Sequence, residues 1–167
     1  MKKIILIFLT AIGMSACTTP STENIDPVSY QTQNKQGMEE VYQFIKSCGY
    51  YFIATTDGDQ PKIRPFGTIH IFENKLYIQT GHKKNVAKQI SKNNKVAISA
   101  YNGKEWIRVE SILVEDPRIE AKKSMLDAYP NLRSMYDEND GNTAVYILTD
   151  AKAEINFNLA EKKTITF

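Results

Sequence analysis

The segment LYIQTGHKKNVAKQI, residues 76–90, contains a hydroxyl, a glycine and two ammonium groups within a stretch of five residues. Thr80 and Gly81 end a strand-like run, and Lys83 and Lys84 come just before a short amphipathic helix. A bound phosphate requires several donors and compensating charge, and free amides at a helix start add to such a site. A solvated turn is the alternative, because two adjacent lysines are most often simply exposed. The segment by itself leaves both interpretations open.

The N-terminal sequence MKKIILIFLTAIGMSAC predicts a signal peptide over residues 1–16. Lys2 and Lys3 precede an uncharged run, and two small residues precede Cys17. This pattern is typical of a secretory signal that is too short to remain as a spanning helix. The cysteine after Met-Ser-Ala resembles the bacterial lipoprotein signal, in which that cysteine is acylated and becomes the mature N-terminus. We therefore expect a protein of the cell envelope, lipid-anchored to a membrane through Cys17 and facing outside the cytoplasm; an ordinary signal peptide with an incidental cysteine is the alternative.

The rest of the chain divides into a tether and one domain. Residues 17–36 are rich in Ser, Thr, Asn, Gln and Pro, and they predict a flexible tether. Residues 37–167 have the size of a single domain, in which Cys48 is the only cysteine, so no disulfide is expected. Without Lys2 and Lys3 the count of 21 basic and 19 acidic residues becomes 19 and 19. A near-neutral domain without a basic stripe argues against nucleic-acid binding.

Hydrophobic patterning predicts a β-rich α+β domain. Helices are expected over 38–48, 84–91, 117–130 and 131–140, and strands over 50–56, 62–72, 75–80, 95–101, 106–116 and 143–157. Pro65 cannot donate to a ladder, so the second strand is expected to be an edge strand or to contain a bulge there. Most strands are joined by turns rather than by helices, which favours a small, largely antiparallel barrel over a doubly wound parallel sheet.

Four stretches in this order resemble one family: ATTDGDQPKIRPF, LYIQTGHKKNVAKQI, NNKVAISAYNGKEWIRV and MLDAYPNLRSMY. They are similar to the pyridoxamine 5'-phosphate oxidase-like, FMN-binding split-barrel proteins, and the similarity extends over residues 38–157. The resemblance implies a six-stranded antiparallel split β-barrel with flanking helices. It also implies a homodimer that binds FMN in each of two clefts between the subunits.

The resemblance also assigns cofactor-binding residues. It implies Arg64, Pro65 and Phe66 beside the flavin ring and ribityl chain, Gln79 and Thr80 at the phosphate and ring, Lys83 and Lys84 at the phosphate, and Trp106 near the flavin. A core aromatic is the alternative role for Trp106. Relatives often have glycine where this chain has Ser111, so the local bend is expected to differ.

The sequence identifies no dedicated catalytic residue. It contains no nucleophile–base pair, and His70 and His82 have no further ligands at metal-binding spacing. The C-terminal KKTITF does not match the substrate-phosphate residues of the oxidases proper, so oxidation of vitamin B6 is not expected. We therefore expect an FMN-dependent oxidoreductase acting on an unidentified small molecule, such as a nitroaromatic or a quinone. The alternative is a non-catalytic envelope lipoprotein that binds FMN, haem or another planar ligand in the dimer cleft.

Overall fold

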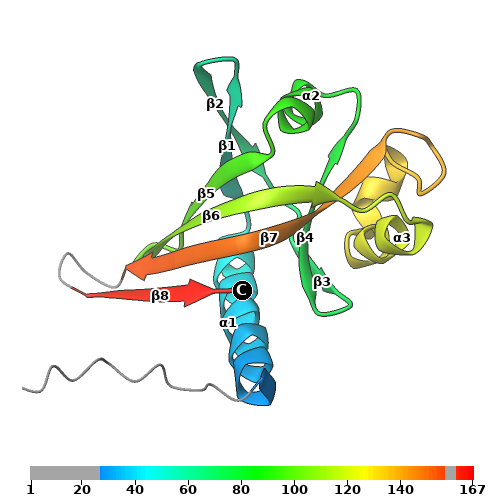
Figure 1. The fold of residues 1–167 in the computed structure, drawn as a ribbon. Coiled ribbons are helices and arrows are strands. Elements are labelled where there is room, and N and C mark those ends of the chain that lie inside the picture. Colours follow the sequence, from blue (N-terminus) through cyan, green and yellow to red (C-terminus); the bar gives the residue numbers. More distant parts are fainter. Residues whose placement is uncertain (1–26, 157–160) are drawn as a thin grey trace, which may run out of the picture.

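The computed structural model describes residues 27–156 and 161–167, so the predicted signal peptide and Cys17 lie outside the described part. The described residues form an eight-stranded antiparallel sheet with helices around it (Figure 1). The strands are β1 (Tyr51–Asp57), β2 (Gln60–Phe66), β3 (His70–Phe72), β4 (Lys75–Gly81), β5 (Lys95–Tyr101), β6 (Trp106–Glu115), β7 (Thr143–Asn156) and β8 (Lys162–Thr166). The helices are α1 (Pro27–Ser47), α2 (Asn85–Lys92), α3 (Ile119–Ala128) and the 3-10 helix η1 (Pro130–Ser134).

The order of strands is β2–β1–β5–β6–β7–β4–β3, and β8 pairs with β7. This arrangement confirms the predicted β-rich α+β split barrel, but the prediction of six strands was wrong. The predicted strand over 62–72 is divided into β2 and β3, since residues 67–69 belong to neither strand. The C-terminal strand β8 was not predicted. Pro65 lies on β2, the edge strand, as its missing N–H requires.

Helix α1 begins eleven residues earlier than the sequence predicted. Its first residue is Pro27, a residue type favoured at helix starts. Residues 27–36 are therefore helical, whereas the predicted tether extended to Gln36. Further along α1, Met38, Val41 and Ile45 are buried in the main core, so the C-terminal half of this helix packs on the sheet.

The core lies inside the curved sheet. β5 alternates strictly between exposed and buried residues, as expected of a strand with one face in the core. The ladder between β5 and β6 is regular, but the β6–β7 register shifts between Glu110 and Ile112. Ser111 lies at this bulge, and its Oγ donates to the carbonyl of Thr149 at 2.8 Å. The serine thus allows the irregularity to form through a hydroxyl hydrogen bond rather than through a glycine.

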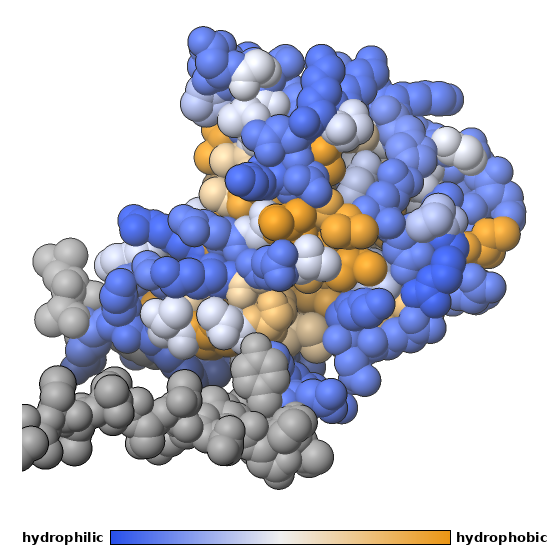
Figure 2. Space-filling model, in the orientation of Figure 1, coloured by the Kyte–Doolittle hydropathy of each residue, from blue (hydrophilic) through white to orange (hydrophobic). Residues whose placement is uncertain are grey.

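Most of the surface in Figure 2 is hydrophilic, and a group of apolar residues lies over the β6–β7 pair. Val114 of β6, which is 45% exposed, belongs to this pair of strands and is opposite Ile147 of β7. Within the described residues, no helix is long and apolar enough to cross a bilayer.

Candidate functional site

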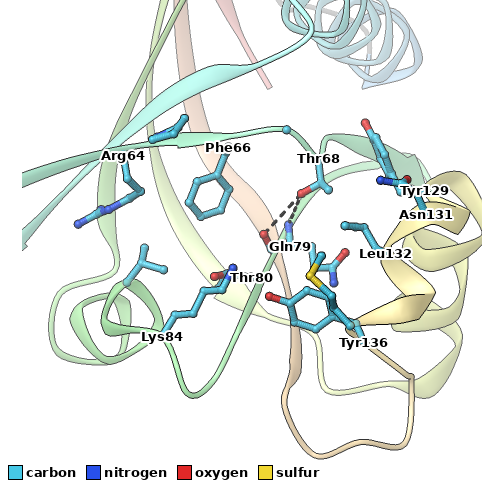
Figure 3. A pocket seen from close by; sticks show the side chains of 14 residues that line it. Arg64, Phe66, Thr68, Gln79, Thr80, Lys84, Tyr129, Asn131, Leu132 and Tyr136 are labelled. Carbon is cyan, nitrogen blue, oxygen red and sulfur yellow. Dashed lines mark hydrogen bonds between the residues drawn. The ribbon is translucent and has the colours of Figure 1, made fainter.

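A cavity of about 310 Å³ opens where β2, β4, α2 and the η1 region meet (Figure 3). One side is formed by the end of β2 and the other by the η1 region, with the end of β4 and the start of α2 between them. The lining residues are Arg64, Pro65, Phe66, Gly67, Thr68, Gln79, Thr80, Lys84, Val86, Tyr129, Asn131, Leu132, Met135 and Tyr136.

Six of the eight residues implied at the cofactor line this one cavity. They are Arg64, Pro65, Phe66, Gln79, Thr80 and Lys84. Arg64 and Lys84 come from β2 and from the start of α2, and the fold brings them to the same opening.

Lys83 and Trp106 are the two implied residues that do not line the cavity. The Lys83 side chain is exposed, and its backbone N–H donates to Oδ1 of Asn142 at 3.1 Å. Trp106 is the first residue of β6, whereas the opposite end of that strand, at Glu115, contacts His82 in the turn before α2. Within one chain, therefore, neither residue is placed to contact a ligand in this cavity.

Arg64 is held in a defined orientation. Its Nη1 donates to Oγ1 of Thr55 at 2.7 Å, and its Nη2 donates to Oε1 of Gln89 at 2.8 Å. Partial burial lowers the pKa of the Arg64 guanidinium. An arginine stays protonated at neutral pH despite such a shift, so the cavity wall carries a positive charge.

Lys84 occupies the N-cap position of α2. Its side chain makes no capping hydrogen bond, so the cap does not satisfy the free amides of the first turn. The ammonium instead lies over the ring of Tyr136, 5.6 Å from its centroid. A helix start with an adjacent lysine attracts anions, and the arginine on the facing strand adds a second positive group.

Gln79 carries buried polar atoms that lack partners. Its backbone is held by Thr68, whose Oγ1 accepts from the Gln79 N–H at 3.2 Å (Figure 3). The side chain is 5% exposed, and within the described residues neither its Nε2 nor its Oε1 has a hydrogen-bond partner. A buried primary amide without partners is costly, and it points to a ligand that can both donate and accept.

The η1 region supplies a wall that the sequence analysis did not assign to the site. Tyr129 fixes this wall to the barrel, because its hydroxyl donates to the carbonyl of Ile69 at 2.8 Å and accepts from the Ile69 N–H at 3.0 Å. Leu132, Met135 and Tyr136 then face the cavity. These residues lie in the MLDAYPNLRSMY stretch, so the resemblance marked the segment without indicating which side chains turn inward.

Gly81 has a packing role in the turn before α2. A Cβ at residue 81 would lie 3.0 Å from Nδ2 of Asn142 and 3.1 Å from a ring carbon of Tyr136. The close contact lets the loop before β7 pack against the 80–84 turn. The same loop accepts the His82 N–H at the Asn142 carbonyl, at 2.8 Å.

Neither histidine lines the cavity. His82 contacts Glu115 through Nε2 at 2.7 Å and the carbonyl of Gly141 through Nδ1 at 3.2 Å. His70 pairs with Ser124 at 2.9 Å, and burial lowers its pKa, with a smaller contribution from Lys46. Over residues 27–156 and 161–167 no group of three or more His, Cys, Asp or Glu side chains could hold a metal ion.

Comparison with solved structures decides the family. The chain is similar to a NimC/NimA family protein from Clostridium acetobutylicum, with 38% identity over 83% of this chain and 97% of that chain and a TM-score of 0.79. The chain belongs to the NimC/NimA family. No protein-family model and no curated protein matches the sequence.

More distant structures share the fold of this NimC/NimA protein. One is a pyridoxamine 5'-phosphate oxidase-related, FMN-binding protein from Nostoc punctiforme, with 14% identity, a TM-score of 0.52 and coverage of 86% of this chain and 98% of that one. Another is a haem-binding protein from Mycobacterium smegmatis, with 10% identity, a TM-score of 0.56 and coverage of 81% and 57%. The predicted likeness to the pyridoxamine 5'-phosphate oxidase-like split barrels is thereby confirmed for the fold.

Proposed function

We propose that this NimC/NimA protein binds FMN in the cavity between β2 and η1 and is a flavin-dependent oxidoreductase acting on a small molecule. The observation that carries the proposal is the buried amide of Gln79, which has no partner among the described residues and lines the same cavity as Arg64 and Lys84. Two cationic groups and an unsatisfied amide in one cavity fit a ligand with an anionic end and a hydrogen-bonding ring edge.

The cationic residues fit a phosphate monoester. Arg64 presents a planar set of donors, Lys84 presents a mobile point charge, and the uncapped start of α2 presents backbone amides. A phosphate dianion placed among these groups would receive charge-assisted hydrogen bonds, which are stronger than neutral ones. We therefore assign the phosphate of FMN to this end of the cavity.

The remaining lining fits a flat ring with a polar edge. Phe66 and Leu132 supply apolar surface, and Gln79 supplies one donor group and one acceptor. The pyrimidine edge of an isoalloxazine carries carbonyl acceptors beside an N–H donor and so complements a primary amide. When bound, FMN supplies hydride and single-electron transfer; the residues of this chain bind it, orient it and exclude water from one face.

The lining also bears on the substrate class. Among the described residues that form the cavity there is no carboxylate, histidine or cysteine. A substrate that needs a strong general acid or base from the protein therefore fits poorly. Compounds that accept electrons from a reduced flavin and take protons from solvent, such as nitroaromatics and quinones, fit this chemistry.

We propose that the functional unit is a homodimer. Phe52 pairs in register with Pro65 on one side and with Ser99 on the other, so these three residues share the outward face of β1, β2 and β5. The same face exposes large apolar side chains, with Phe52 43% and Ile63 70% exposed. Contiguous exposed apolar surface marks an interface. Because Pro65 belongs both to this face and to the cavity lining, a second copy would place the cavity at the subunit boundary.

We further propose that the protein is anchored in the cell envelope through Cys17. The helix α1 begins ten residues after that cysteine, which would leave a short connection between anchor and domain. An exported flavoprotein lacks access to the cytosolic nicotinamide pool, so the reductant is expected to be an envelope redox protein or an extracellular electron carrier. Anaerobic reduction of the purified protein by NADPH at a rate that supports turnover would contradict this assignment.

The alternative is a non-catalytic protein that binds haem or another planar ligand. A solved haem-binding protein shares the fold, which gives the alternative a structural basis. Haem iron is most often held by histidine or by a thiolate, and neither residue type lines the cavity among the described residues. The geometry therefore favours flavin.

Absorbance and mass spectrometry of the purified protein test the proposal. We expect a flavin spectrum, an FMN mass after denaturation, and bleaching and reoxidation with an electron-accepting substrate. A ligand-free protein that fails to bind added FMN, or one that binds haem instead, would contradict the proposal.

A further inference from the structure

Arg64 is held by two neutral side chains that belong to different elements. Thr55 lies on β1 and Gln89 on α2, and each accepts one hydrogen bond from the guanidinium of Arg64, at 2.7 Å and 2.8 Å. The two holders are also joined to each other, because Oγ1 of Thr55 donates to Oε1 of Gln89 at 2.7 Å. The three side chains therefore form a closed ring of hydrogen bonds.

The ring is rigid because both holders are buried. Thr55 is 3% exposed and Gln89 is 5% exposed. Arg64 itself is only partly buried and lines the cavity, so the ring fixes one edge of the guanidinium and leaves the remaining donors available. A polar network whose members are all satisfied restricts its side chains to one arrangement.

The two partners of Arg64 are neutral, whereas two other arginines of this protein are bonded to carboxylates. Arg118 is bonded to the carboxylates of Asp116 and Glu73, and Arg133 to those of Asp127 and Glu138. Over the described ranges, by contrast, no carboxylate lies within ion-pair distance of Arg64.

The amide of Gln89 also contacts a carboxylate, in the hydrogen-bond role opposite to its contact with Arg64. Nε2 of Gln89 faces Oδ2 of Asp57 at 3.5 Å, a long hydrogen bond, while Oε1 faces the guanidinium. The glutamine thus contacts the carboxylate through its amide N–H and the guanidinium through its amide oxygen. A partly buried cation without a counter-ion is costly, and an anionic ligand removes that cost.

We propose that Gln89 and Thr55 are positioning residues that orient Arg64 toward an anionic ligand without neutralising its charge. The inference rests on the proposed function, because FMN is the ligand whose phosphate would use that charge. It adds a requirement that phosphate binding alone does not contain: the residue at position 89 must be an uncharged hydrogen-bond acceptor.

The test compares Gln89→Glu and Gln89→Met with the wild-type protein, using FMN and riboflavin as probes. Gln89→Glu keeps the side-chain shape and the hydrogen-bond acceptor but adds a negative charge. Gln89→Met removes the acceptor and adds no charge. We expect FMN affinity to fall by about tenfold or more in Gln89→Glu, since one charge-assisted interaction is lost. Gln89→Met is expected to bind FMN more weakly than wild type but more tightly than Gln89→Glu.

Riboflavin separates this role from a merely structural one. It lacks the phosphate, so its affinity is expected to be the same in all three proteins. The dependence of FMN binding on salt is expected to weaken in Gln89→Glu alone. Thr55→Asp and Thr55→Asn repeat the comparison of a charged with a neutral side chain on β1, because Asp and Asn have nearly the same size. We expect Thr55→Asp to bind FMN more weakly than Thr55→Asn.

Four outcomes would overturn the inference. The first is FMN binding in Gln89→Glu that equals or exceeds that of Gln89→Met, because orientation alone would then suffice. The second is an equal loss of affinity for FMN and for riboflavin in every variant. The third is loss of the fold in Gln89→Glu together with equal FMN affinity in the two Thr55 variants. The fourth is a wild-type protein that binds neither flavin, and this outcome alone also contradicts the proposed function.

Discussion

The hydroxyl of Thr68 accepts a hydrogen bond from the backbone N–H of Gln79 at 3.2 Å and also faces its carbonyl oxygen at 3.5 Å. This contact joins the segment after β2 to the end of β4. It fixes the backbone of Gln79, while the side-chain amide in the cavity wall has no partner among the residues that the structure describes. The fold therefore keeps two polar atoms buried and unsatisfied at the proposed flavin site.

Replacement of Gln79 by leucine is expected to have opposite effects on stability and binding. Leucine removes two unsatisfied polar atoms, so the free energy of unfolding without ligand should rise by about 1–2 kcal/mol. FMN affinity should fall, because the pyrimidine edge of the isoalloxazine loses its hydrogen-bond partner. Urea denaturation and FMN titration measure the two effects.

Gln89→Leu is the matched control for Gln79→Leu. Gln89 is equally buried but has its hydrogen bonds made, so the same substitution there should destabilise the protein. If Gln79→Leu destabilised the protein as much as Gln89→Leu, the amide of Gln79 would have to be satisfied within the protein itself and would not be available to a ligand.

Gly81→Ala is expected to destabilise the protein by about 1–3 kcal/mol, the usual cost of adding atoms to a packed region. The new methyl group would meet Asn142 and Tyr136 at 3.0–3.1 Å. Gly67→Ala is the control, because a Cβ there meets no atom of the described residues within 4 Å. Thermal denaturation compares the two variants; equal melting temperatures would show that the loop before β7 moves aside without cost.

Asp116 makes stability depend on pH in the acid range. Hydrogen bonds from the Arg118 side chain, opposed by burial, lower the pKa of the Asp116 carboxyl from 3.8 to about 2. Because the folded-state pKa is below the unfolded value, the ionised carboxylate stabilises the fold above about pH 4 and this contribution disappears as the pH falls toward about 2. Asp116→Asn should therefore cost about 1–2 kcal/mol at neutral pH and flatten the acid part of the stability curve.

Urea denaturation between neutral and acid pH measures this effect. Asp59→Asn is the control, since Asp59 is exposed in the turn between β1 and β2. A parallel loss of stability with falling pH in wild type and Asp116→Asn would assign the acid sensitivity to other carboxylates, of which Asp140 is the first candidate. Burial raises the pKa of Asp140, but backbone N–H groups, those of Thr143 and Asn142 foremost, outweigh it and lower that pKa to about 2.

The dimer proposal predicts that Ile63→Asp converts the protein to monomers. Ile63 pairs with Ala54 on the apolar face of β1 and β2, where a charge cannot be buried without a partner. Ile119→Asp is the control, because Ile119 is 51% exposed on α3 and lies away from that face. Light scattering after size-exclusion chromatography gives the mass. A wild-type monomer, or an Ile63→Asp dimer, would contradict the proposed interface.

Local sequence patterns predicted the fold well where a local constraint determines the structure. The alternation in β5 and the proline on β2 both correspond to the structure, since each reflects a local constraint. Helix α1 begins at Pro27, in a segment whose polar composition is typical of a tether. The helix is stabilised further along by the packing of Val41 and Ile45 onto the sheet, which the composition of its first residues does not reveal. Strand β8 depends on pairing with β7, which no local pattern reveals.

The site was predictable only in part, for a similar reason. The resemblance identified the β2 and β4 residues and Lys84, which come together because of strand and helix order. Gln89 and Thr55 were missed, because a buried glutamine on a helix has no sequence signal until its partner Arg64 is placed opposite it. Tyr129 was missed similarly, since its two hydrogen bonds to Ile69 join residues 60 positions apart.

The most direct test of the account is the affinity of four proteins for FMN and for riboflavin: wild type, Arg64→Ala, Lys84→Ala and Lys83→Ala. We expect wild type to bind FMN more tightly than riboflavin. Arg64→Ala and Lys84→Ala should each lose about tenfold or more of FMN affinity with riboflavin affinity unchanged, and Lys83→Ala should resemble wild type. Equal binding of FMN and riboflavin by wild type, or FMN affinity that is unchanged in both Arg64→Ala and Lys84→Ala, would contradict the account.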